Sequence, residues 1–311
     1  MDKTEIQFVY VDVFASTPLT GAPLTLVTDA DGVTDEQMRA VAREFNQSET
    51  TFVQRATVTP ATRRLRSFTP TGQEVYGAGH NALGAWLWLA SSGELELDGD
   101  ETTFTSHIGN EVLPVHVRRT DGRDIVVTMD QTPPVFGDVV TDRAELAAAL
   151  GLREDDLVAD RPAQVVDTGA GHLLVPVRDR AAVDRAAPDA ARLTAALKAV
   201  GGEGCYLYTG DTVDDSATAY ARFFNPAMGI AEDPATGTAA GPLGALLVAG
   251  GVVEPAATGE ATVIVEQGQS MGRPSRITVT VAGSRVQVSG SGLVVARGTM
   301  TLPQTLPEVS R

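Results

Sequence analysis

The chain has 311 residues, of which 43% are apolar, and it carries 24 Lys and Arg against 40 Asp and Glu, a formal net charge of −16. Such an acidic chain lacks the basic face with which nucleic-acid-binding proteins displace counterions, so no nucleic-acid partner is expected. The apolar share allows a sizeable core, and the length indicates two domains. No apolar run is long enough to span a membrane and no secretory signal pattern is present, so a cytoplasmic protein is expected.

Two scarce residue types narrow the chemistry. Cys205 is the only cysteine, which excludes a disulfide framework, a multi-cysteine zinc site and a pair of catalytic thiols. The two lysines, Lys3 and Lys198, lie at the start of the chain and on a charged helical segment, where a Schiff-base lysine is not expected. The four histidines do not show the His-Glu-x-x-His spacing of zinc proteases.

The first part of the chain predicts strands that alternate with two helices. Residues 6–14 are typical of a strand, and an amphipathic helix with a capping box follows and ends near Asn46. The next strand begins at about Thr50, so Glu49 lies at a helix-to-strand corner. Residues 82–90 have no polar face, which is typical of a buried helix. Further strands are expected to end near 68 and to cover 103–106, 111–118 and 124–129.

A Pro-rich segment that starts at residue 131 predicts the boundary between two domains. The first domain is then residues 1–130 and the second is residues 131–311. The last strand, at about 293–302, is a candidate to return to the first domain.

The second part predicts a similar mixture of elements. Amphipathic helices are expected at 141–150 and 180–200, and a second helix without a polar face is expected at about 238–249. Strands are expected at 164–168, 173–177, 204–208 and 217–224, and through the last sixty residues.

Two segments repeat one pattern. Residues 66–70 and 222–226 both read Arg-x-Phe-x-Pro, and each is followed by a loop with an acidic residue, a glycine with a polar neighbour, and an apolar helix. The repeat predicts a duplicated domain. The alternative is a chance similarity of two strand–loop–helix units.

The two apolar helices begin at Gly79-His80 and at Gly237-Thr238. The first N–H groups of a helix have no acceptor within it, and the helix dipole favours an anion there. Glycine at such a position lets a ligand approach the backbone closely. Two such helix starts, one in each domain, predict a site for a small carboxylate between the domains. The alternative is that both glycines serve only as turn residues.

The candidate proton-handling groups lie at the same junctions. His80 begins the first apolar helix, Asp233 lies in the loop before the second, and Glu49 lies at its corner. A carboxylate in a mostly apolar cleft has a raised pKa and can act as a base and then as an acid near neutral pH. Glu49 is therefore the predicted acid–base group, with a solvated surface residue as the alternative.

A family resemblance rests on motifs that run through nearly the whole chain. These motifs are residues 11–14, 21–23, 42–50, 77–80, 168–169, 232–238 and 272–275. The segments Asn-x-Ser-Glu-Thr and Glu-Asp-Pro-Ala-Thr-Gly are together highly specific. On these motifs the chain resembles the phenazine-biosynthesis PhzF family, within the diaminopimelate-epimerase superfold.

The resemblance implies an α+β fold of two pseudo-symmetric domains, each a curved β-sheet or barrel wrapped round a central buried helix. It implies a homodimer, a small carboxylate substrate, and no metal or organic cofactor. Glu49 matches the catalytic glutamate of the family, and His80 and Asp233 match supporting catalytic residues. The predicted substrate-binding residues are Gly79, Gly237, Thr238, Thr168 and Gly169.

The resemblance also separates two chemistries. The epimerase and racemase branch of the superfold places a cysteine at each buried-helix start, where this sequence has Ala78 and Thr236. The PhzF branch implies an isomerase that uses one carboxylate on one face of the substrate. Ala22 stands where the family usually has asparagine, which leaves the substrate open.

The resulting hypothesis is a cofactor-independent isomerase of secondary metabolism, such as antibiotic biosynthesis, acting on a small unsaturated cyclic amino or carboxylic acid. Glu49 removes an allylic proton and returns it to a vinylogous carbon. Two alternatives stay open. One is an amino-acid epimerase that uses Glu49 with Asp233 or His80, and the other is a catalytically silent homologue that only binds a carboxylate.

Overall fold

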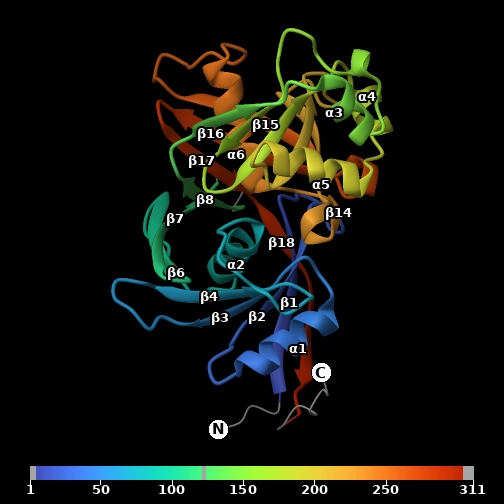
Figure 1. Cartoon of the computed structure of the whole chain (residues 1–311). Helices are drawn as coiled ribbons and strands as arrows, with labels where there is room; N and C mark the ends of the chain where they lie inside the picture. Colours follow the sequence, from blue (N-terminus) through green and yellow to red (C-terminus); the bar gives the residue numbers. More distant parts are fainter. Residues whose placement is uncertain (1–4, 121–123, 304–311) are drawn as a thin grey trace. The chain divides into compact units, whose positions relative to one another are not determined.

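A helix without a polar face needs apolar surface on every side, and the structure supplies it in each of two units (Figure 1). The computed structural model describes residues 5–120 and 124–303. The N-unit comprises Met1–Met129 with Ser291–Arg311, and the C-unit comprises Asp130–Gly290. Each unit is a mixed sheet packed against one buried helix, and the α+β fold class predicted from the sequence is confirmed.

The helices of the N-unit are α1 (Asp35–Phe45) and α2 (His80–Ser91). Its strands are β1 (Glu5–Val13), β2 (Ala22–Val27), β3 (Thr50–Arg55), β4 (Arg63–Phe68), β5 (Glu74–Val75), β6 (Glu101–Ile108), β7 (Glu111–Arg119), β8 (Ile125–Gln131) and β18 (Gly292–Thr301). The pairing order is β18, β1, β2, β3, β4, β6, β7, β8, with parallel pairs at β2–β3 and β4–β6. The short strand β5 pairs with the end of β4. The chain's last strand, β18, thus lies beside its first.

The helices of the C-unit are α3 (Arg143–Ala149), α4 (Arg180–Arg185), α5 (Ala190–Ala199) and α6 (Gly237–Ala249), with 3₁₀ turns at Glu154–Asp156, Pro226–Met228 and Gln269–Met271. Its strands are β9 (Val135–Val139), β10 (Gln164–Asp167), β11 (Gly171–Pro176), β12 (Gly204–Thr209), β13 (Ala219–Asn225), β14 (Ile230–Asp233), β15 (Ala261–Gln267), β16 (Ser275–Ala282) and β17 (Arg285–Gly290). The pairing order is β9, β10, β11, β12, β13, β15, β16, β17, with parallel pairs at β11–β12 and β13–β15. The short strand β14 pairs with the end of β13.

The two pairing orders match strand for strand, and the repeated Arg-x-Phe-x-Pro segments occupy the same place in both. Arg66 on β4 donates to both carboxylate oxygens of Glu74 on β5, each at 2.7 Å. Arg222 on β13 does the same to Glu232 on β14, at 2.9 and 2.7 Å. Each guanidinium also lies over the ring of the repeat's phenylalanine, at 5.1 and 4.9 Å from the ring centre. The repeat therefore has a physical function, which is to hold the short strand that leads to each buried helix.

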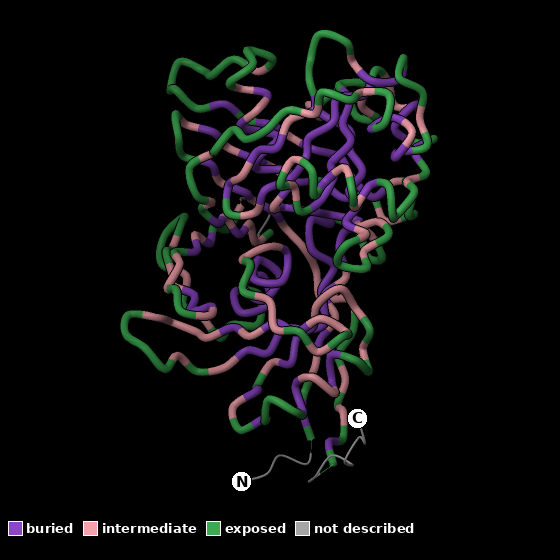
Figure 2. The backbone as a smooth tube through the Cα atoms, in the orientation of Figure 1, coloured by how far each residue is buried: buried purple, intermediate pink, exposed green. Residues whose placement is uncertain are grey.

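Helix α2 is buried along its length, from His80 to Ala90, and Figure 2 shows it in purple. It contacts β1, β2, β3, β4, β7 and β18, so the sheet of the N-unit curves round it. Gly84 is required for this approach, because a Cβ there would lie 2.6 Å from Leu24 and 2.7 Å from Val13. Among the described residues, no helix combines the length and the apolar character needed to cross a bilayer.

Three local predictions differ from the structure. The single helix predicted at 180–200 is wrong, because α4 and α5 are separate: Pro188 stands between them, and the Asp189 side chain caps α5 by accepting from the Arg192 amide at 2.9 Å. The Pro-rich segment from residue 131, for which no regular element was predicted, contains strand β9, although the N-unit ends at Met129, beside the predicted boundary. Asp233 is not a loop residue, since it ends β14.

Candidate active site

The corner that carries Glu49 is set by two helix signals. A capping box of Thr34 and Gln37 starts α1, and Asn46 ends it in the left-handed conformation with φ at 51°. Strand β3 begins at Thr50. Glu49 is therefore held between a terminated helix and a paired strand.

The structure brings Glu49 and His80 into contact. Glu49 Oε2 lies 3.1 Å from His80 Nε2, and the Ser48 hydroxyl lies 3.4 Å from the same nitrogen. The Glu49 side chain is 19% exposed and the His80 side chain 10%. His80 is the first residue of α2, so the ion pair joins the corner before β3 to the start of the buried helix.

The prediction that the pKa of Glu49 is raised is wrong, because its pKa is lowered overall. Burial does raise this pKa, and it is the largest single influence. The charge and the hydrogen bond of His80, together with a hydrogen bond from Ser48, outweigh it, so the pKa of Glu49 lies below its ordinary value of 4.5. Glu49 is thus a carboxylate at neutral pH, the form that accepts a proton.

A buried amide side chain organises the backbone before α2. The Gly79 amide donates to Asn81 Oδ1 at 3.0 Å, and Asn81 Nδ2 donates to the Gly77 carbonyl at 3.0 Å and to the Ser67 hydroxyl at 2.9 Å. The Gly79 amide is therefore engaged with Asn81 rather than presented to a ligand. Sequence reasoning missed Asn81, although a polar residue at the start of an otherwise apolar helix is a usable signal.

The start of α6 carries the second group of predicted residues. The amides of Ala239 and Ala240 both donate to the Thr236 carbonyl, so the amides of Gly237 and Thr238 precede the first helical hydrogen bonds. The Thr236 hydroxyl donates to Asp233 Oδ2. The Asp233 carboxylate is thereby fixed beside the tip of the helix.

Thr168 and Gly169 lie in the turn between β10 and β11. The Thr168 hydroxyl donates to Gln131 Oε1 at 2.7 Å, and Gln131 Nε2 donates to the Gly237 carbonyl at 3.1 Å. Gln131 lies so close to α6 that a Cβ on Gly241 would be 1.7 Å from its Oε1, so a larger residue at 241 would displace the Gln131 side chain. The structure thus links Thr168 to the start of α6 through Gln131, which no local sequence pattern indicated. The Gly169 amide donates to Asp167 Oδ1 at 2.6 Å.

His172 supports Thr238 from the sheet. Its Nε2 lies 3.3 Å from the Thr238 hydroxyl, and its ring meets the Phe223 ring edge-on. Burial lowers the pKa of His172 to about 4, so the ring is neutral at physiological pH. Sequence reasoning missed His172, although a lone histidine in the apolar strand β11 is a usable signal.

We expect the protein to become less stable in acid, because the pKa of the buried His172 ring is lowered in the folded state. The folded-state pKa lies below the ordinary 6.5, so the unfolded chain binds the proton first, and stability is complete above pH 6.5 and falls as the pH drops to about 4. The loss is about 3 kcal/mol for this one group. Chemical denaturation of wild type and His172→Gln at several pH values checks this, with His116→Gln as the control. Parallel pH dependences in wild type and His172→Gln would contradict it.

The only cysteine is not placed for catalysis. Cys205 is fully buried in β12, and burial raises the pKa of its thiol. The residues just before the two helix tips are Ala78 and Thr236. Racemisation by two thiols at these positions is therefore unavailable to this chain.

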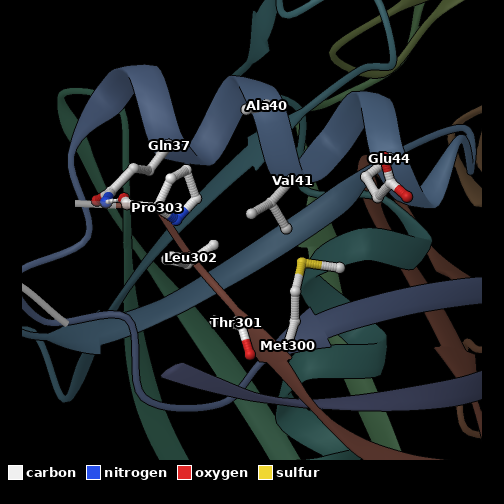
Figure 3. A pocket seen from close by; sticks show the side chains of 8 residues that line it. All are labelled: Gln37, Ala40, Val41, Glu44, Met300, Thr301, Leu302 and Pro303. Carbon is white, nitrogen blue, oxygen red and sulfur yellow. Dashed lines mark hydrogen bonds between the residues drawn. The ribbon is translucent and has the colours of Figure 1, made fainter. Parts of the chain in front are cut away.

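Two pockets of the N-unit lie away from the predicted residues. One, of about 250 Å³, lies between α1 and the end of β18 (Figure 3), and it is lined by Gln37, Ala40, Val41, Glu44, Met300, Thr301, Leu302 and Pro303. The other, of about 520 Å³, is lined by Arg64, Arg66, Glu74, Tyr76, Ile108, Gly109, Asn110 and Glu111. Neither pocket contains a predicted site residue. The predicted site residues form two groups, one at the start of α2 in the N-unit and one at the start of α6 in the C-unit.

Comparison with known proteins places this geometry in a family. A family model described as phenazine biosynthesis-like protein, PhzC-PhzF, matches residues 11–298. The chain belongs to the PhzC-PhzF family. This confirms the resemblance found in the sequence, and with it the prediction of a PhzF-like isomerase at the level of the family.

Three similar proteins illustrate the family. The uncharacterized isomerase YfhB of Bacillus subtilis is 31% identical over 301 residues, which cover 96% of this chain and 99% of that protein. The trans-2,3-dihydro-3-hydroxyanthranilate isomerase of Pseudomonas aeruginosa is 33% identical over 301 residues, covering 94% and 98%. The crystal structure of a PhzF-family phenazine biosynthesis protein from Bacillus anthracis matches with a TM-score of 0.88 and 29% identity, covering 96% of this chain and all of that one.

Proposed function

We propose that the chain is a cofactor-independent isomerase that shifts a proton and a double bond in a small unsaturated cyclic amino or carboxylic acid of secondary metabolism. The observation that carries this proposal is the Glu49 carboxylate, mostly buried and held in its ionised form 3.1 Å from His80. Only the ionised form of a carboxylate can take a proton from carbon. The isomerases among its relatives support the same reaction class.

In the proposed reaction Glu49 acts first as base and then as acid. It takes a proton from an allylic C–H bond, and the electron pair of that bond forms a new C=C bond. The electrons of the old double bond then take the proton from Glu49 at the vinylogous carbon, so the product is an isomer of the substrate. Because protonation of Glu49 ends its ion pair with His80, the histidine is then available to stabilise negative charge on the substrate.

The substrate carboxylate is assigned to the start of α6. The amides of Gly237 and Thr238 lie at the positive end of the helix dipole, where an anion is favoured. His172 holds the Thr238 hydroxyl, and Thr236 holds the Asp233 carboxylate, which is suited to bind an amine or a hydroxyl of the substrate. Thr168 and Gly169 complete this set in our proposal, Thr168 through its contact with Gln131. Gly79 contributes through the α2 start that its amide helps to form.

Solvent exchange tests the reaction directly. The protein is incubated in heavy water with trans-2,3-dihydro-3-hydroxyanthranilate and with unsaturated cyclic amino acids, and the products are read by NMR. Double-bond migration with deuterium at the vinylogous carbon supports the proposal. Deuterium at one stereocentre without migration indicates an epimerase, and saturable binding without exchange at any carbon indicates a silent homologue.

We also propose that the protein is a cytoplasmic homodimer. An apolar surface that could bind a second copy is β9, whose residues are all exposed and include Val135 at 64% and Phe136 at 43%. Light scattering is expected to give twice the chain mass of 32.5 kDa, and Phe136→Asp is expected to shift the protein towards the monomer. A wild-type monomer at micromolar concentration contradicts the homodimer, and a dimeric Phe136→Asp variant contradicts this choice of surface. Fractionation of the source cells tests the location.

A further inference from the structure

Gln267 makes a complete set of buried hydrogen bonds beside the candidate carboxylate site. It ends β15 and is fully buried. Its Nε2 donates to the Asp233 carbonyl at 2.7 Å and to the Thr236 hydroxyl at 3.0 Å. Its Oε1 accepts from the Thr236 amide at 3.1 Å and from the Tyr206 hydroxyl at 2.8 Å. Both donors and both lone pairs of the amide are used.

The orientation of this amide follows from its backbone partners. The Thr236 amide can only donate, so it must face Oε1, and the Asp233 carbonyl can only accept, so it must face Nε2. Three of the four bonds go to residues 233–236, the segment that runs from the last residue of β14 to the residue before α6. A single side chain thus fixes both ends of the segment that carries the Asp233 carboxylate to the tip of the helix.

Tyr206 supports Gln267 from the opposite side. Its ring is fully buried, and burial together with the charge of Asp233 raises the pKa of its hydroxyl, so it stays a neutral donor. Removing this hydroxyl leaves all three bonds from Gln267 to residues 233–236 in place. Tyr206 therefore offers a control that perturbs the same buried network without freeing the segment.

In the N-unit, a different residue holds the segment before the buried helix. In the parallel pair β13–β15, Gln267 faces Ala221, the residue before Arg222. In the equivalent pair β4–β6, the residue before Arg66 is Leu65, and it faces Ile108. The strand position of Gln267 is apolar in the N-unit, where Asn81 of the helix itself binds the preceding loop instead. The duplicated fold does not require an amide at this strand position.

We propose that Gln267 is a positioning residue for the reaction, which holds Asp233 and the start of α6 in the geometry that binds substrate. This inference rests on the proposed function. Gln267 does not touch the reacting atoms in this proposal, because it acts through Asp233 and Thr236. Loss of its four bonds frees the segment and weakens substrate binding, while the Glu49 acid–base step is unaffected once substrate is bound.

Steady-state kinetics of Gln267→Met and Tyr206→Phe distinguish a positioning role of Gln267 from a role in folding stability alone. Both changes remove buried hydrogen bonds and lower the midpoint of thermal unfolding. We expect Gln267→Met to raise KM at least tenfold and to leave kcat within about threefold, and Tyr206→Phe to leave both close to wild type. A purely structural role lowers the fraction of folded enzyme, which reduces apparent kcat and leaves KM unchanged, and that result overturns the proposal. If Gln267→Met does not fold, Thr236→Val tests the same segment and is expected to raise KM.

Amide hydrogen exchange gives a readout that does not need turnover. We expect the Thr236 amide to exchange at least tenfold faster in Gln267→Met than in wild type, and at the wild-type rate in Tyr206→Phe. Equal protection in Gln267→Met and wild type overturns the inference even if the enzyme turns over no compound. The proposed function fails separately, if Glu49→Gln retains activity or if no compound exchanges in heavy water.

Discussion

Replacing Glu49 by glutamine is expected to lower kcat for isomerisation by at least 10²-fold, because general acid–base catalysis contributes about 10²–10⁴-fold. Glutamine keeps the size of the side chain and its ability to accept a hydrogen bond from His80, but it cannot take up a proton from carbon at neutral pH. The loss should fall on kcat rather than on KM, since the substrate carboxylate is assigned to the start of α6. Deuterium incorporation from heavy water measures the same step.

Glu44→Gln is the matched control for this experiment. Glu44 lies on α1, is exposed, and undergoes the same change of charge and shape. Its kcat is expected to stay within twofold of wild type. Glu49→Gln with activity within tenfold of wild type, and with a native circular dichroism spectrum, removes Glu49 from the base role.

Replacing His80 by glutamine is expected to move the acid limb of the pH–rate profile to higher pH. In the wild type, the pKa of Glu49 lies below 4.5, because His80 outweighs the effect of burial. Glutamine removes the charge of His80 and leaves the burial, so the pKa of Glu49 rises above 4.5. We expect the limb of kcat/KM to shift upwards by about one pH unit or more, a size typical of a lost ion pair.

The direct measurement is the titration of the Glu49 side-chain carbon by ¹³C NMR, assigned with the Glu49→Gln variant. It separates the pKa of Glu49 from any loss of rate that His80→Gln causes. Ser48→Ala should shift the pKa in the same direction by less, and His116→Gln should not shift it. A Glu49 pKa that is unchanged or lower in His80→Gln contradicts the electrostatic account.

The same ion pair also makes the stability of the fold depend on pH. The folded-state pKa of Glu49 is lower than its value in the unfolded chain, so the carboxylate contributes stability above pH 4.5. That contribution is lost as the pH falls through the folded-state pKa. The pair therefore adds to stability at neutral pH, in addition to keeping Glu49 ready to accept a proton.

The two units show how a duplicated framework can hold different chemistry. Both use an arginine–glutamate pair, a short strand and a buried helix, in the same order. The residue that follows the glycine at the helix tip is His80 in the N-unit and Thr238 in the C-unit. The first pairs with a carboxylate, and the second is held by a neutral histidine. The arginine–glutamate pair and the short strand position the start of each buried helix. The side chain at that start, His80 or Thr238, determines which groups the helix start can bind.

Much of the fold could be predicted from the sequence because its signals are local. An apolar face on every side of residues 82–90 indicates a buried helix, and the capping box at Thr34 and Gln37 indicates a helix start. The family motifs similarly name Glu49 and His80 as one site. The break between α4 and α5 also has a local signal, Pro188, which the prediction of one helix at 180–200 does not use.

The sequence by itself determined the elements that neighbouring residues form. These include the two buried helices with their glycine-led starts, and the corner that carries the Glu49 carboxylate. Only the tertiary structure decided which other distant groups meet: Gln267 with Thr236 across 31 residues, and Gln131 with Gly237 across 106. It also decided the sign of the pKa shift at Glu49, which depends on the balance between burial and a neighbouring charge. Both depend on distances in space, and sheet pairing sets these distances independently of separation along the chain.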